Sequence, residues 1–318
     1  MMAAEQPLSG TVLVTGGAGF IGSMLVEKIL PMADRVFIID DLTTGNESAV
    51  PDAPNITFYR ASITDDTVLD DVLPQVDYVF HLACRNLVQS VTRMEEDFHV
   101  NLYGGFKLLQ KTHELNPALK RFVYASTASV YSQASVFPTG EWYHNVTLPY
   151  AASKFGMEQY CHVFFHTYQF PVTVLRFSNL YGPGQLVSNP YCGVVAAFFD
   201  ACARGEDMPV FGNGEQTRDF TYIEDGLSAL VLAAGRPEAV GRVFNIGTGR
   251  ETTINTLAAL VKKTAKTRES RIRYEPERPV DVVKRRVVDT AFIEKELGWR
   301  PAYSLEQGLE ETRRWLDE

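Results

Sequence analysis

A chain of 318 residues, 45% of them hydrophobic, is long enough to bury a large core in one or two domains. Its net charge of −9 argues against a general nucleic-acid binder and against a protein that adheres to membrane surfaces. The first residues show no signal-peptide pattern, and no apolar run approaches the ~20 residues needed to cross a bilayer. The four cysteines have no metal-ligand spacing, so we expect free thiols, no bound metal and a soluble protein of the cytoplasm.

In the first half of the chain, short apolar runs rich in β-branched residues alternate with longer stretches of helical spacing. The predicted helices include residues 20–30, 92–115 and 149–169. The predicted strands are residues 11–16, 35–40, 56–60, 77–83, 121–126 and 172–177. Buried strands separated by helices indicate βαβ units with right-handed crossovers. The pattern therefore predicts an α/β, Rossmann-type fold, with a doubly wound parallel sheet covered on both faces.

A glycine-rich loop joins the first predicted strand to the first predicted helix. Gly16, Gly19 and Gly22 are spaced GxxGxxG, and glycines there let the backbone approach a pyrophosphate held at the helix N-terminus. Asp40 ends the second strand, where its carboxylate can accept hydrogen bonds from a ribose 2′-hydroxyl. Asp41 follows, and no arginine comes directly after it to offset the repulsion of a 2′-phosphate. The pattern predicts NAD, in preference to NADP, as the cofactor.

The regular alternation ends after residue 178. Residues 178–193 are rich in Gly, Pro, Asn and Ser and indicate an irregular loop. A helix over 193–204 and a strand over 208–212 follow, while 242–249 indicates one more strand of the first sheet. We therefore assign residues 1–178, with about 224–250, to an NAD-binding domain, and residues 179–223 and 251–318 to a smaller mixed α/β lobe for the substrate.

Two tyrosine–lysine pairs share one spacing, Tyr150 with Lys154 and Tyr103 with Lys107. Four residues are about one helical turn, so both side chains of a pair lie on one face. An ammonium and an oxidised nicotinamide beside the phenol favour the phenolate and lower the phenol pKa, by ~3 units if it is to approach neutrality. Such a phenol can act as the base for an alcohol or sugar hydroxyl.

Position along the chain separates the two pairs. Open α/β sheets bind their ligands at the carboxyl ends of the strands. Tyr150 follows the fifth strand, with Pro149 suited to the first turn of its helix and Thr127 at the strand end as a third hydrogen-bonding group. Tyr103 lies within a predicted helix beside two glycines, without such a strand end before it. We therefore predict Tyr150 as the catalytic tyrosine and Tyr103 as a packed or half-exposed helix residue.

Several ordered motifs together resemble the extended short-chain dehydrogenase/reductase superfamily. The resemblance covers nearly the whole chain and indicates the NAD-dependent nucleotide-sugar epimerases and dehydratases, of the UDP-glucose 4-epimerase type. The motifs are TGGAGFIG (15–22), IDDLTTGN (39–46), HLAC (81–84), VNLYGG (100–105), STASVY (126–131), PYAASK (149–154), RFSNLYGPGQ (176–185), GNGEQTRDFTYIED (212–225) and LGW (297–299). No single motif is specific, whereas their ordered combination is.

The resemblance implies roles for particular residues. Thr127, Tyr150 and Lys154 would form the catalytic group, with Asn101 supporting the helix that carries the pair. The residues implied at the cofactor are Gly16, Gly19, Phe20, Ile21, Gly22, Asp40, Ser62, Ile63, Leu82, Ala83, Asn101, Tyr150 and Lys154. Those implied at a nucleotide-diphosphate sugar are Thr127, Asn179, Val210, Phe211, Arg218 and Arg278. The two arginines suit a diphosphate because a guanidinium forms paired hydrogen bonds with phosphate oxygens; for Arg218, a surface ion pair with a neighbouring carboxylate is the alternative.

The residues after Thr127 indicate the reaction. Dehydratases of this family usually carry an acidic pair there to protonate a leaving hydroxyl, and uronate decarboxylases commonly carry a glutamate at the second place. Ala128 and Ser129 stand at these positions. We therefore expect a C4 epimerase, with a UDP-sugar favoured, that regenerates NAD in each cycle. A decarboxylase, a dehydratase and a non-catalytic NAD-binding redox sensor or scaffold are the alternatives; proteins of the last kind commonly lose the tyrosine or lysine that this chain keeps.

Some positions depart from the family pattern. Ser62 stands where an aspartate near the adenine is usual, Arg85 replaces a glutamine, and Ser178 replaces an aromatic residue. The last two lie near the expected sugar pocket, which favours an unusual sugar. Arg285 and Arg286 lie near the position that limits bulk around the sugar in this family. They would attract a carboxylate on the sugar, or they are solvated charges at a strand edge.

The resemblance also implies assembly. In this family, helices corresponding to 92–115 and 149–169 pair between two subunits in a four-helix interface. We therefore expect a homodimer, with no nucleic-acid or membrane partner.

Overall fold

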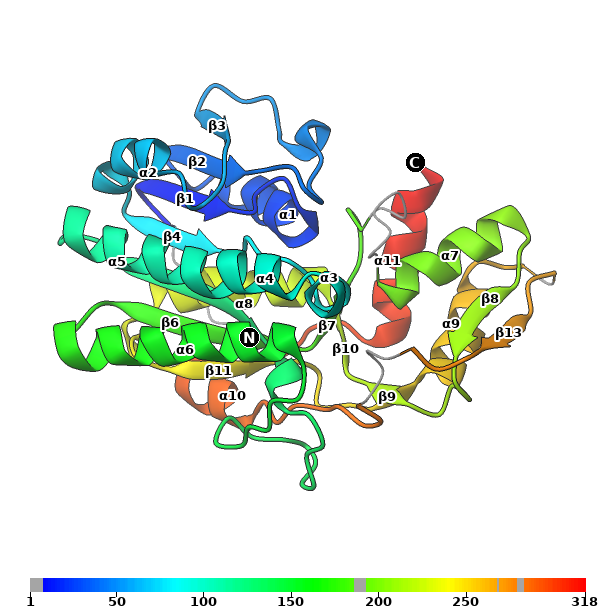
Figure 1. Cartoon of the computed structure of the whole chain (residues 1–318). Coiled ribbons are helices and arrows are strands. Elements are labelled where there is room, and N and C mark those ends of the chain that lie inside the picture. Colours follow the sequence, from blue (N-terminus) through cyan, green and yellow to red (C-terminus); the bar gives the residue numbers. More distant parts are fainter. Residues whose placement is uncertain (1–7, 186–192, 268, 279–282) are drawn as a thin grey trace.

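The computed structural model describes residues 8–185, 193–267, 269–278 and 283–318 (Figure 1). Part of the predicted loop at 178–193, including Cys192, lies outside the described residues. The other three cysteines are free thiols. None of the described helices combines the length and the apolar character that a membrane span needs.

Seven parallel strands form the central sheet, in the order β11-β6-β5-β4-β1-β2-β3. They are β1 (Thr11–Thr15), β2 (Arg35–Asp40), β3 (Ile56–Arg60), β4 (Tyr78–His81), β5 (Arg121–Thr127), β6 (Val172–Phe177) and β11 (Val243–Ile246). The order reverses beside β1, and open α/β sheets bind ligands at such a switch point. This confirms the predicted Rossmann-type fold, including the late return of the chain to the sheet in β11.

Helices cover both faces of this sheet (Figure 1). Successive strand residues point to opposite faces, so Val12 and Val14 pack in one core cluster while Leu13 packs in another. The first cluster contains residues of α1 (Phe20–Ile29) and α8 (Ile223–Gly235). The second contains residues of α2 (Asp66–Val72), α5 (Gly105–Leu115) and α6 (Pro149–Tyr168). Because both faces are covered, the strand ends are where the sheet is open to a ligand.

The single helix predicted over 92–115 is wrong in one respect, because the structure divides this stretch. Helices α3 (Leu87–Thr92) and α4 (Met94–Asp97) are separated at Arg93, and a π-helix (Phe98–Gly104) precedes α5. Asn101, inside the π-helix, exchanges hydrogen bonds with the backbone N–H and carbonyl of Arg85, at 2.7 and 3.0 Å. These tertiary bonds help to offset the poorer geometry of the π-turn, a feature that is frequent at functional sites.

The second lobe contains α7 (Val194–Arg204), β8 (Met208–Phe211), α9 (Ile254–Thr264), β13 (Ile272–Glu275) and α11 (Leu305–Asp317) (Figure 1). Short strand pairs join β7 (Asn179–Tyr181) to β10 (Phe220–Tyr222) and β9 (Thr217–Arg218) to β12 (Thr252–Thr253). Helix α10 (Ala291–Leu297), predicted with this lobe, packs on the main sheet instead. The ring centroids of Phe292 and of Phe244 in β11 are 5.2 Å apart. The exact domain boundaries stay a prediction.

Candidate active site

The carboxyl ends of the central strands border a cavity of about 420 Å³. Its wall combines the glycine loop after β1 with residues at the ends of β2, β4, β5 and β6. Every residue predicted at the cofactor lines it except Asn101, and so do Thr127 and Asn179 from the predicted substrate set. Asn101 lies behind the wall, where it holds the backbone of Arg85 and lies 3.4 Å from Ser153 of α6.

The glycine loop fits a dinucleotide. Gly16 has a φ of +72°, and a Cβ on Gly22 would lie 2.1 Å from the carbonyl oxygen of Gly16, so neither position accepts a side chain. Helix α1 begins after Gly19 without a side-chain cap and without an acidic residue in its first turn. Its first N–H groups are therefore available to a pyrophosphate, whose charge also suits the helix dipole.

Asp40 and Asp41 lie in the cavity wall at the end of β2, where a third charge accompanies them. Asp40 is buried, and its two oxygens accept hydrogen bonds from the N–H groups of Ala18 and Leu42. The sequence predicts Arg85 beside the sugar, but the structure pairs its guanidinium with Asp41 at 2.9 Å. Burial acts to raise the pKa of Asp41, but the hydrogen bonds from Arg85 and Thr43, with the charge of Arg85, together outweigh it, and the net shift is downward. Sequence reasoning missed this pair because its members are 44 residues apart.

Asp40→Ala should weaken the preference for NAD over NADP by about 10- to 100-fold, because the ribose hydroxyls lose a charged acceptor. Arg85 keeps its pairing with Asp41 in this variant but still supplies a positive charge beside a 2′-phosphate, so Asp40→Ala/Arg85→Gln should bind NADP less well than Asp40→Ala alone. Calorimetric titration with both dinucleotides measures the ratio. Equal or tighter binding of NADP to the unaltered protein would contradict the assignment.

Thr127, Tyr150 and Lys154 come together at the end of β5 and the start of α6. The Thr127 hydroxyl lies close enough to Tyr150 to lower the pKa of its phenol. Lys154 is buried one turn further along α6, with its ammonium 4.5 Å from the ring centroid of Tyr124. Pro149 occupies the first turn of α6, as the sequence predicts. All three side chains line the cavity.

Electrostatics in the protein alone differ from those predicted with the cofactor. Burial raises the pKa of Tyr150 well above its usual value, and nearby Cys84 acts in the same direction. The Thr127 hydroxyl and the guanidinium of Arg286 oppose this rise. Burial also lowers the pKa of Lys154. The predicted lowering of the Tyr150 pKa needs the charge of an oxidised nicotinamide as well, so it stays a prediction about the complex.

The second tyrosine–lysine pair lies away from the cavity. Tyr103 lies in the π-helix and is 43% exposed. Its ring stacks on that of His99, with ring centroids 5.2 Å apart. Lys107 pairs with Asp66 at 2.8 Å. The same spacing therefore places this pair on an outer helix face.

Several residues predicted at the substrate do not line this cavity. Val210 and Phe211 belong to β8, and the Arg278 guanidinium lies over the Phe211 ring at 4.3 Å. Arg218 donates from Nη1 to the carbonyls of Thr217 and Val283. Their contact with a nucleotide sugar stays a prediction.

All three departures lie in the wall, and the two serines have other partners than Arg85. The Ser62 hydroxyl is 2.9 Å from that of Thr64, and the Ser178 hydroxyl is 2.6 Å from that of Thr221. Both serines therefore have protein partners on their own side of the cavity.

His81, at the end of β4, makes the stability of this region depend on pH. It is buried beside Thr15, whose hydroxyl is 2.8 Å from its Nδ1. Burial, and then the charge of Lys154, lower its pKa to about 3. Below its ordinary pKa of 6.5 the unfolded chain binds a proton that the folded protein does not, so the free energy of unfolding falls as the pH falls.

Between pH 6.5 and about pH 5 this residue should remove about 2 kcal/mol from the free energy of unfolding. Urea unfolding at about pH 7.5 and about pH 5 measures the fall. His81→Asn, which keeps a partner for Thr15 but does not titrate, should reduce the fall by that amount. An equal fall in both proteins would show that other groups cause it.

Comparison with known proteins agrees with this geometry. Residues 12–247 match the model of the NAD dependent epimerase/dehydratase family. A putative UDP-glucose 4-epimerase of Methanocaldococcus jannaschii is 32% identical, over 96% of this chain and 98% of that protein. A UDP-N-acetyl-alpha-D-glucosaminuronate decarboxylase of Bacillus cytotoxicus is 31% identical, over 96% and 97%. Other relatives of similar identity are named dTDP-glucose 4,6-dehydratases.

Solved structures agree as well. The UDP-glucose 4-epimerase of Thermotoga maritima, solved with UDP-glucose, matches with a TM-score of 0.90 and 36% identity, covering 96% of this chain and 98% of that one. Another neighbour, from Thermus thermophilus, is a complex with NAD. The match to the family model covers well over half of the chain, and the cofactor of this family is NAD. The chain therefore belongs to the NAD-dependent epimerase/dehydratase family of nucleotide-sugar enzymes.

Proposed function

We propose that this protein is an NAD-dependent 4-epimerase of a nucleotide-diphosphate sugar, with a UDP-sugar favoured. The observation that carries the proposal is the Thr127–Tyr150–Lys154 group in the wall of the dinucleotide cavity. Such a group can remove a proton from a sugar hydroxyl and return it.

Each residue of the group has its own part. Tyr150 takes the proton of the C4 hydroxyl, and the nearby Thr127 hydroxyl favours its ionised form. Lys154 supplies a positive charge that favours the phenolate. NAD, when bound in this cavity, would supply the hydride acceptor and donor that inversion at C4 needs. Tyr150 finally gives the proton back to the inverted oxygen.

Dehydration is disfavoured because an acid is needed to protonate the leaving hydroxyl. Ala128 and Ser129, the positions for such an acid, are buried and carry no ionisable group at neutral pH. Among the described residues, the carboxylates in the cavity wall are Asp40 and Asp41, at the adenosine end. Decarboxylation of an acidic sugar is the second candidate, because the guanidinium of Arg286 lies near Tyr150.

Incubation with a panel of UDP-, dTDP- and CDP-sugars, with the products identified by NMR, tests the proposal. The expected product has the composition of the substrate and the opposite configuration at C4. Loss of water would instead indicate a dehydratase. Bound NAD without turnover of any sugar in the panel would favour a sensor or scaffold protein.

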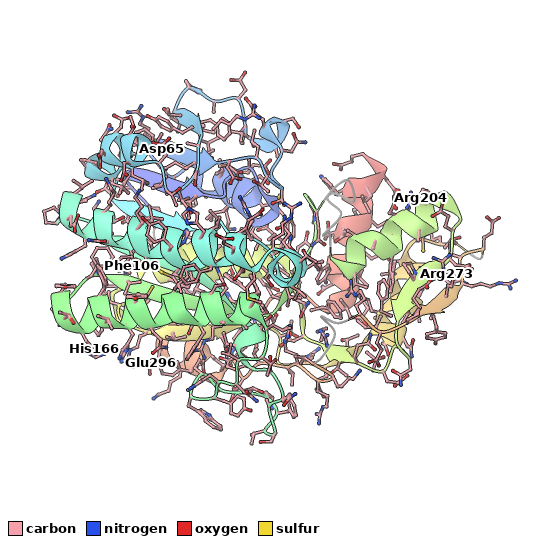
Figure 2. All side chains as sticks on the ribbon, viewed as in Figure 1. Asp65, Phe106, His166, Arg204, Arg273 and Glu296 are labelled. Atoms are coloured by element: carbon pink, nitrogen blue, oxygen red, sulfur yellow. The ribbon has the colours of Figure 1, made fainter. Side chains whose placement is uncertain are left out.

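We also propose a homodimer, formed through the outer faces of the π-helix and α6. Phe106 of α5 packs against Tyr160 of α6, with ring centroids 4.7 Å apart (Figure 2). The π-helix and α6 carry exposed apolar side chains, namely Phe98, Tyr103, Tyr160, Val163 and Tyr168. Exposed apolar surface on adjacent helices is typical of an interface.

Light scattering at micromolar concentration should give the mass of a dimer, and Tyr160→Glu/Val163→Glu should give that of a monomer. Trp142→Glu is the matched control, because Trp142 is 71% exposed but lies outside these helices. A monomer mass for the unaltered protein would refute the proposal.

A further inference from the structure

Arg286 lies in an extended segment next to the active site. Residues 283–289 are held on one side by β9, where the N–H of Thr217 donates to the carbonyl of Lys284. On the other side, the N–H of Thr139 donates to the carbonyl of Val287. The backbone is therefore fixed on both sides of Arg286, and this restricts the directions that its side chain can take.

The two neighbouring arginines have different surroundings. Arg285 is exposed, pairs with Glu251 at 2.9 Å and covers the ring of Phe137 at 4.1 Å. Arg286 has its Nε enclosed and without a hydrogen-bond partner, and no carboxylate pairs with it in the part of the chain that the structure describes. The groups close enough to act on its charge are Arg218 and Tyr150. Of the two alternatives that the sequence leaves open, Arg285 fits a solvated charge and Arg286 does not.

A half-buried guanidinium whose Nε is enclosed and that has no counter-ion is unfavourable. Withdrawing a charge from water costs several kcal/mol unless a partner replaces the water. Burial, and then the like charge of Arg218, lower the pKa of Arg286 to about 9, so it is still protonated at neutral pH. A bound anion would offset this cost.

The position of Tyr150 indicates which part of a substrate supplies the anion. If Tyr150 takes the proton of the C4 hydroxyl, the charge of Arg286, which acts on Tyr150, also acts on groups close to that carbon. In a hexose, C5 is bonded to C4 and carries C6, whereas the diphosphate is attached at C1, across the ring. An anionic group at C6 is therefore the better match for Arg286.

We infer that the sugar of the substrate carries a carboxylate at C6, and that Arg286 binds this carboxylate and so determines specificity. The inference rests on the proposed function, because it places the reacting carbon of a nucleotide sugar at Tyr150. A guanidinium forms paired hydrogen bonds with a carboxylate, most favourably where both are shielded from water. A neutral sugar leaves the same guanidinium unpaired, which disfavours it.

A carboxylate at C6 also opens a second outcome of the same oxidation. Once C4 is a ketone, the C5–C6 bond is β to the carbonyl, and its electron pair can pass into an enolate as carbon dioxide leaves. The enolate takes a proton at C5, and the returned hydride reduces the ketone to an alcohol. With an acidic sugar, NMR therefore distinguishes a C4-inverted uronate from a product one carbon shorter; either product is consistent with binding by Arg286.

The test compares sugars that differ only at C6, with Arg285→Gln as the control for Arg286→Gln. The probes are UDP-glucuronate against UDP-glucose, and their 2-acetamido counterparts. Calorimetry on the NAD-loaded protein should show tighter binding of the acidic member of a pair. Arg286→Gln should weaken that binding by about 10- to 100-fold and change the neutral sugar little. Arg285→Gln should change neither by more than about threefold, as expected for an exposed charge.

Two results would overturn the inference. One is equal or tighter binding of both neutral sugars by the unaltered protein. The other is an equal loss for acidic and neutral sugars in Arg286→Gln, which would assign Arg286 to the diphosphate or to Tyr150. Binding and product formation are measured separately, so a failure of the proposed function is distinguished from a failure of the inference. If only the proposed function is wrong, acidic sugars bind through Arg286 but yield no product.

Discussion

Tyr150→Phe should remove most turnover while leaving the fold and NAD binding nearly intact. The change deletes one hydroxyl, which is the group proposed to carry the proton of the sugar. General-base catalysis is typically worth ~10²–10⁴-fold, so a loss of that order is expected. The ring itself is kept, so its packing at the start of α6 should be unaffected.

The matched control is Tyr103→Phe, the same change in the other tyrosine–lysine pair. That hydroxyl lies on an exposed helix face and not in the cavity wall, so turnover should stay within a small factor of the original. Initial rates measured side by side, with the sugar identified from the panel, separate the two variants. If Tyr103→Phe abolished activity and Tyr150→Phe did not, the active site would be misassigned.

The strands, the glycine loop and the Tyr150 helix were predictable because their signals are local. Val12 to Thr15, for example, form a buried run that leads directly into a turn requiring Gly16. Residues close in sequence determine such features, so a pattern of a few residues is sufficient. The order of the strands follows from the fold class and not from any one of these patterns.

The features that escaped prediction depend on residues far apart in the chain. The break in the helix over 92–115 accompanies the bonds between Asn101 and Arg85, and Arg85 reaches Asp41 only because β2 and β4 both flank β1. The surroundings of Arg286 differ from those of Arg285 because distant parts of the chain pack against the segment that carries both residues. Periodicity and spacing contain no information on such pairings.

A buried ion pair beneath the active-site helix is another feature without a local signal. Glu158 of α6 and Arg176 of β6 are both buried, and the Arg176 Nη2 lies 2.6 Å from a carboxylate oxygen of Glu158. The Arg176 Nη1 donates to the Tyr131 hydroxyl at 2.8 Å, and the Ser126 hydroxyl donates to Glu158. The pair therefore anchors the helix that carries Tyr150 to the strands beside it.

Glu158→Leu should lower the free energy of unfolding by about 3–5 kcal/mol, because it leaves the Arg176 guanidinium buried without its counter-ion. Glu158→Leu/Arg176→Met should recover much of this loss, since removal of both charges eliminates the unpaired one. Asp317→Ala, which breaks the exposed pair with Arg313 in α11, should cost less than about 1 kcal/mol. Urea unfolding of the four proteins gives the comparison. A cost for Glu158→Leu as small as that for Asp317→Ala would mean that water or a structural shift compensates Arg176, and the anchoring role of the pair would be wrong.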